Sequence, residues 1–131
     1  MEPPKADTPP QRASRWRGID HVQLAIPVGA EDRARRFYVD TLGMTEVAKP
    51  AALAVRGGAW FRAGSVELHV GVEADFVPAR KAHPALLVEG LPEFVEAVGL
   101  DARWSDEIAG TTRCHIDDPF GNRIELIDTA G

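Results

Sequence analysis

Apolar and polar residues alternate along residues 18–27, where Val22, Leu24 and Ile26 are apolar and a proline closes the run. A period of two places every second side chain on one face of an extended chain, so this run is predicted to be a β-strand. Residues 31–43 instead have apolar positions at helical spacing, acidic residues near the start and a glycine at the end. That pattern predicts an α-helix.

Three further strands are predicted to complete the first half of the chain. Residues 44–48 form a short extended run, and residues 57–64 and 65–72 form two longer runs that share a tight turn. Between them, residues 50–56 are expected to be a connection. The order is therefore a strand, a helix and three strands.

The same order returns after a polar linker at residues 73–82. A unit that occurs twice dictates the architecture. We predict an α+β fold of two tandem βαβββ modules, module one at 18–72 and module two at 83–128. Their curved sheets are expected to form an incomplete barrel around a central cavity. The elements of module two are predicted at 83–90, 91–99, 101–106, 111–118 and 122–129.

Length and composition limit the class of protein. A chain of 131 residues suits one domain, so we expect a single domain at 18–131 behind a disordered tail at 1–17, which holds four prolines and no periodic apolar face. The net charge of −5 argues against a nucleic-acid partner. No apolar run approaches the roughly 20 residues of a membrane helix. With a single cysteine and no apolar leader, a cytoplasmic location is expected.

The two halves match at the residues with the strongest metal-binding chemistry. His21 and His83 each open the first strand of a half, and Glu67 and Glu125 each lie inside the last strand. Paired sheets around one space would bring these four side chains together. Imidazole and carboxylate groups suit Zn, Ni, Co, Mn or Fe(II), and an open coordination position polarises a substrate oxygen. We predict a divalent-metal site for a small-molecule substrate with two adjacent oxygens.

Three other side chains are candidates for the same cavity. His69 follows Glu67 by two residues and so faces the same side of the strand, which makes it an alternative second ligand or a substrate contact. His115 and Trp60 are further candidate substrate contacts. Each also has an ordinary interpretation, a strand histidine near a turn or an aromatic ring packed in the core.

Several segments together resemble the vicinal oxygen chelate superfamily, which includes glyoxalases, extradiol dioxygenases and antibiotic-resistance proteins. The resemblance spans residues 18–128. It implies the paired βαβββ fold, the metal ligands His21, Glu67, His83 and Glu125, and a homodimer in which modules sometimes pair across chains. The segments that carry it are GIDHVQLAIP, RRFYVDTLGM, VELHV, HPALLVEG and DDPFGNRIELID.

The expected function is that of a metal-dependent lyase or isomerase that acts through an enediolate-type intermediate, with Glu125 or Glu67 as the base. Glyoxalase I binds glutathione through an Arg and an Asn placed four residues after its first two ligands. Here Ala25 and Gly71 stand at those positions, so glutathione dependence is not expected.

Two other functions stay open. An extradiol-type Fe(II) dioxygenase would leave one of the two glutamates off the metal. A non-catalytic protein that binds a drug-like molecule would use an aromatic groove, for which Trp60, Phe61 and Trp104 are the candidates.

Overall fold

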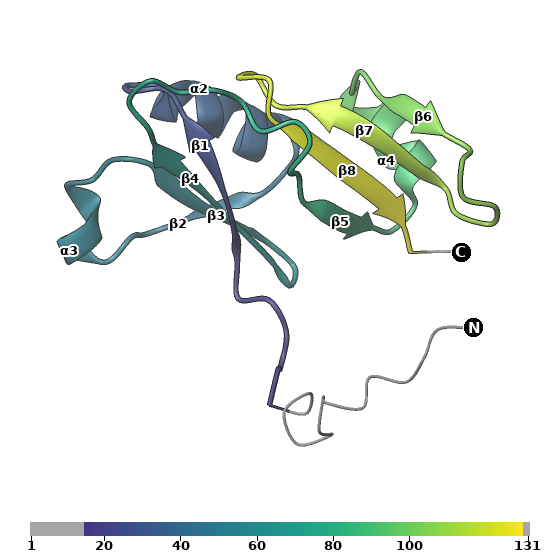
Figure 1. Ribbon diagram of the computed structural model, residues 1–131, viewed down its shortest axis with the longest axis horizontal. Helices are drawn as coiled ribbons and strands as arrows, with labels where there is room; N and C mark the ends of the chain where they lie inside the picture. The colour runs from purple at the N-terminus through teal and green to yellow at the C-terminus, as the bar shows by residue number, and fades with distance from the viewer. Residues whose placement is uncertain (1–14, 130–131) are drawn as a thin grey trace.

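The computed structural model describes residues 15–129. Residues 1–14, which make up most of the predicted tail, lie outside the described residues. The described chain forms two four-stranded sheets, ordered β1-β4-β3-β2 and β5-β8-β7-β6 (Figure 1). Within residues 15–129, no helix is both long and apolar enough to cross a bilayer.

Module one contributes the first sheet. The first and last strands of this module pair in parallel, and a helix lies in the chain between them. The other neighbouring strands of the sheet pair in antiparallel fashion. The elements are β1 (Val22–Ile26), α2 (Glu31–Arg35), η1 (Arg36–Thr41), β2 (Thr45–Val47), α3 (Ala51–Ala54), β3 (Ala59–Ala63) and β4 (Val66–Val72).

Module two repeats this plan, with β5 parallel to β8 and the remaining pairs antiparallel. The predicted α+β fold of two tandem modules is therefore confirmed. The two sheets do not close into a barrel. The elements are β5 (Ala85–Val88), α4 (Leu91–Val98), β6 (Arg103–Ser105), β7 (Arg113–Asp117) and β8 (Arg123–Asp128).

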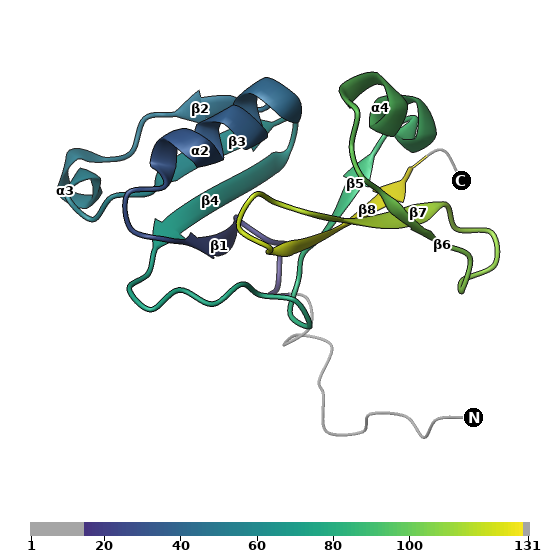
Figure 2. The same cartoon turned by 90° about the horizontal axis from the view of Figure 1, so that it is seen from above.

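The structure differs in detail from two local predictions. The helix expected over 31–43 is α-helical only to Arg35 and then π-helical, as the Leu42 amide shows by donating to the Phe37 carbonyl, five residues back, at 2.9 Å. The expected connection at 50–56 contains the short helix α3, which projects at the end of the molecule far from module two (Figure 2).

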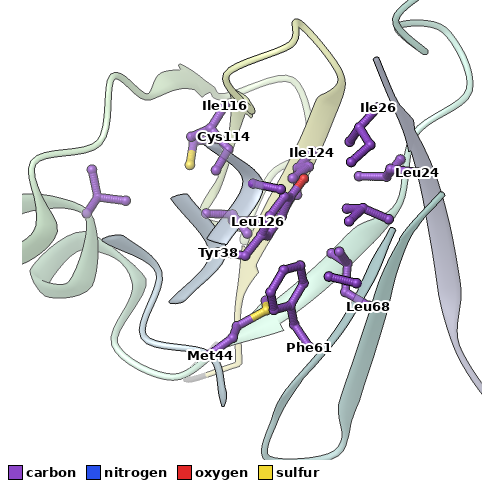
Figure 3. Packing of buried hydrophobic residues seen from close by; sticks show 14 of the residues in the cluster. Leu24, Ile26, Tyr38, Met44, Phe61, Leu68, Cys114, Ile116, Ile124 and Leu126 are labelled. Atoms are coloured by element: carbon purple, nitrogen blue, oxygen red, sulfur yellow. The ribbon is translucent and has the colours of Figure 1, made fainter. Parts of the chain in front are cut away.

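One hydrophobic core lies between the modules and is built from one face of each sheet. Leu24 of β1 and Leu68 of β4 meet Ile124 and Leu126 of β8 in this core (Figure 3). Since side chains alternate along a strand, the residues between them point away from the core. Glu67 and Glu125 are such residues, so each lies on the outer, polar face of its sheet.

A buried polar network ties the two modules together beside that core. Tyr38 of η1 donates a hydrogen bond of 2.8 Å to a carboxylate oxygen of Asp118, in the turn between β7 and β8. The Asn122 side-chain amide donates to the same oxygen and to the Ala25 carbonyl of β1, at 2.9 and 2.8 Å. Local sequence patterns do not predict this network, because its members are up to 97 residues apart.

Burial and the nearby Asp118 carboxylate raise the pKa of Tyr38 well above its ordinary value of 10.0. The folded state therefore retains the phenol proton at a pH where the unfolded chain loses it. The stabilisation is complete below the unfolded pKa and is lost as the pH rises above it. Tyr38 is the only tyrosine, so absorbance at 295 nm follows this group alone. We expect no tyrosinate signal near pH 10 until the protein unfolds. A reversible transition near pH 10 in folded protein would contradict this.

Candidate functional site

The candidate site residues gather in two clusters, one on the outer face of each sheet. The module-two cluster comprises His83, Arg113, His115 and Glu125. The module-one cluster comprises His21, Trp60, Arg62, Glu67 and His69.

In the module-two cluster, one carboxylate oxygen faces two imidazoles. Glu125 Oε1 lies 3.2 Å from His83 Nε2 and 3.8 Å from His115 Nε2. One donor atom from each of these three residues lies within 4.8 Å of the others, and all three side chains are half-buried. Two imidazoles and a carboxylate at this spacing form a set that suits a divalent transition metal.

The hydrogen bonds of His83 favour a cation at this point. Its Nδ1 lies 2.9 Å from the Lys81 carbonyl oxygen, which can only accept, so Nδ1 carries a proton. In the neutral ring, Nε2 then presents a lone pair to the Glu125 carboxylate. Two acceptors 3.2 Å apart repel each other, and either a proton on Nε2 or a metal ion between the two atoms removes that repulsion. A backbone carbonyl that fixes the ring in this way is the usual partner of a metal-bound histidine.

The second Glu125 oxygen is held by a buried arginine. Arg113 donates to Glu125 Oε2 at 3.0 Å and to the Ser105 hydroxyl at 3.2 Å. Burial alone raises the pKa of Glu125, but the Arg113 hydrogen bond and the contact with His83 outweigh it and hold that pKa below its ordinary value. Glu125 is therefore ionised at neutral pH, with one oxygen fixed and the other directed at the imidazoles.

His115 completes the group as a neutral imidazole. Burial lowers its pKa from the ordinary 6.5, against the opposing effect of the Glu125 carboxylate. A neutral ring has the free lone pair that a metal ligand requires.

The module-one cluster is a stack of parallel rings beside a glutamate. His69 lies between His21 and Trp60, with ring centroids 4.1 Å from each. His69 is buried, and burial lowers its pKa below the ordinary value. Its Nε2 is 3.6 Å from one oxygen of Glu67, while Arg62 binds the other oxygen.

These contacts decide between several interpretations left open by the sequence. Arg62 is paired with Glu67. Phe61 is fully buried in the core and cannot line an aromatic groove, and Trp104 is exposed on another sheet. Trp60 faces a cavity together with His21 and Glu67.

The two halves are less alike in register than their sequences indicate. Val22 pairs with Leu68, so His21 and Glu67 both stand one residue before the first pair of β1 and β4. In module two, Ala85 is the strand partner of Glu125, and His83 lies two residues earlier. The His83 ring nevertheless lies against Glu125, with Nε2 3.2 Å from Oε1.

The structure brings together His83, Glu125 and the neighbouring His115, but not all four predicted ligands in one chain. Within residues 15–129, the only group of three or more donor atoms at metal-binding spacing is that of module two. His21 and Glu67 belong to the other module, and within the described residues neither is part of that donor group.

Arg113 is a member of the module-two cluster that sequence reasoning missed. It precedes His115 by two residues on β7 and so shares its face. That spacing was visible in the sequence, but the pairing of β7 with β8, which sets Arg113 beside Glu125, was needed to give it a role.

Comparison with solved structures identifies the fold and the family. No family model and no curated protein matches the chain. A protein from Bacillus anthracis assigned to the glyoxalase family is 46% identical, with 86% of this chain and 95% of that chain covered and a TM-score of 0.83.

Two more distant structures share the fold. Lactoylglutathione lyase from Agrobacterium tumefaciens is 19% identical, with 82% of this chain and 92% of that chain covered and a TM-score of 0.59. The fosfomycin resistance protein FosX from Listeria monocytogenes is 12% identical, with 86% and 91% covered and a TM-score of 0.59. The family assignment rests on the similarity to the Bacillus anthracis protein, which covers 86% of this chain at 46% identity. The chain belongs to the glyoxalase family, within the vicinal oxygen chelate superfamily.

Proposed function

We propose that this protein is a divalent-metal-dependent lyase or isomerase that acts on a small molecule with two adjacent oxygens. The observation that carries the proposal is the donor set of module two, in which His83, His115 and Glu125 converge within 4.8 Å. The fixed tautomer of His83 and the ionised state of Glu125 fit a bound cation.

His83 and Glu125 would hold the metal, with His21 and Glu67 as the other predicted ligands. When bound, the ion would polarise a substrate carbonyl and so acidify the adjacent carbon. A base must then move a proton on that carbon to form the enediolate. Glu67 suits this role better than Glu125, because its partner Arg62 is 56% exposed and can move, whereas Arg113 beside Glu125 is 11% exposed.

We propose further that the four-ligand site forms in a homodimer, with His21 and Glu67 from one chain and His83 and Glu125 from its partner. Among residues 15–129 of one chain, His21 and Glu67 do not join the donor group of His83, His115 and Glu125, which supports this arrangement. A glutathione substrate is not proposed, since Ala25 and Gly71 offer no charged or amide side chain. We place the activity in the cytoplasm.

The first test is the metal content of the purified protein and of His83→Ala. We expect about one divalent ion per chain in the wild type, as one such donor set binds one ion, and little in the variant. Circular dichroism and elution volume would confirm that the variant is folded. Wild-type protein that holds no metal after incubation with Zn, Ni, Co, Mn and Fe(II) would refute the proposal.

One observation favours a second function, an extradiol-type dioxygenase. Two histidines and one carboxylate with open positions are the set that non-haem Fe(II) oxygenases use, and module two supplies that set within one chain. Preferential retention of iron, together with oxygen consumption on a catechol, would select this function over the first.

A further inference from the structure

We propose that the substrate carries a carboxylate remote from its two adjacent oxygens, and that Arg56 and Lys49 bind this carboxylate. The proposal rests on the metal-dependent function above and names the substrate class for the same site. The carboxylate would lie in the cavity on the outer face of module one, here called the trough, which has a volume of about 670 Å³.

The trough has two chemically different ends. One end holds His21 and Glu67, the proposed ligands, together with Asp20. The other end is formed by the loop between β2 and β3, which contributes Lys49, Leu53 and Arg56. The rings of Trp60 and His69 line the trough between these ends and offer an apolar surface to a carbon skeleton.

Arg56 is a cation without a partner in the folded chain. Within residues 15–129, its guanidinium has no hydrogen bond or ion pair. Arg62, the other arginine of the trough, is already paired with Glu67. In a protein of net charge −5, this leaves a locally positive end to the cavity. A guanidinium is well suited to bind a carboxylate through two parallel hydrogen bonds.

The loop that carries these cations is held in place. Lys49 Nζ donates a hydrogen bond to the Gly57 carbonyl and so joins the two ends of the loop, here called its neck. An ammonium group has three N–H donors, so two remain available to a ligand. The Gly58 amide donates to the Glu31 carboxylate of α2 at 2.9 Å. Glu31 does not line the trough itself, although its carboxylate also lies beside Gly57, so Arg56 and Lys49 give this end two positive charges against one nearby negative charge. A side chain at Gly58 would collide with the Val70 carbonyl of β4. Glycine at this position therefore allows the loop to lie close against β4.

The distance between the ends sets the length of the substrate. The neck of the loop lies beside Val72, where a Cβ on Gly57 would meet that side chain. Val72 is five residues along β4 from Glu67, which corresponds to roughly 16 Å of strand. Arg56 is long enough to reach back over part of this span. A substrate with its carboxylate several bonds away from the paired oxygens fits better than one in which they adjoin.

The test measures binding by calorimetry, using Zn-loaded and metal-free protein. The probes are 3-(3,4-dihydroxyphenyl)propionate, which has paired oxygens and a remote carboxylate, and the corresponding amide, which lacks the charge. We expect the acid to bind the Zn-loaded wild type about tenfold more tightly than the amide, as one well-placed ion pair provides. Arg56→Gln should remove this preference without weakening the amide. Arg36→Gln, which removes an exposed arginine outside the trough, should retain it.

The outcomes separate this inference from the function on which it rests. Two results would overturn the inference alone: metal-dependent binding of both probes without preference for the acid, or a preference that survives in Arg56→Gln. If zinc strengthens the binding of neither probe but Arg56 still selects the acid, the carboxylate subsite stands and the metal-dependent function fails.

Discussion

Mixing His21→Ala with His83→Ala is expected to restore metal binding that each variant lacks by itself. In a site shared between two chains, a mixed dimer combines an intact His21 and Glu67 from one chain with an intact His83 and Glu125 from the other. Random association makes half of the dimers mixed, and each has one intact site of two, so we expect about 0.25 ions per chain. The chains would be refolded together and the metal measured by elemental analysis.

A matched control uses two lesions in the same half-site. A mixture of His21→Ala with Glu67→Gln contains no dimer with an intact site, so it should bind no more metal than either variant alone. Failure of the first mixture to regain metal would argue against a shared site. Full metal content in His21→Ala alone would show that His83, His115 and Glu125 of one chain suffice, which favours the two-histidine, one-carboxylate alternative.

Asp118→Ala is expected to destabilise the fold more than any other single carboxylate substitution proposed for this protein. The Asp118 side chain accepts hydrogen bonds from Tyr38, from the Phe120 amide, and from both the amide and the side chain of Asn122. Each buried donor left without an acceptor costs about 1–3 kcal/mol. We therefore expect a loss of about 3–5 kcal/mol, measured by urea unfolding.

The neighbouring residue provides the control. Asp117 carries the same charge, but it is 48% exposed and pairs with Arg103 on the surface. Asp117→Ala should cost no more than about 1 kcal/mol. Equal losses from the two substitutions would show that the buried network does not hold the modules together. Tyr38→Phe, which removes one bond of the network, should cost about 1 kcal/mol.

The repeat accounts for how much of the fold could be predicted from the sequence. Alternation in residues 18–27 and helical spacing in 91–99 are local signals. They predict a strand and a helix, which the structure contains as β1 and α4. The π-helical turn of η1 was not predicted, since it arises where Tyr38 turns into the core and bonds to Asp118. The helix α3 was missed because it is a single turn after a proline.

By itself, the sequence determined the modules and the chemistry available to them. It placed one histidine and one glutamate at matched positions in the first and last strands of each module, and predicted that all four would meet in one central cavity. Only the tertiary structure decided which of these side chains meet. Burial of the apolar sheet faces in one core turns Glu67 and Glu125 to the polar faces of different sheets, and the His83 ring lies against Glu125 although the strand partner of Glu125 is Ala85. Such contacts depend on how distant segments pack, and local sequence patterns carry no record of that packing.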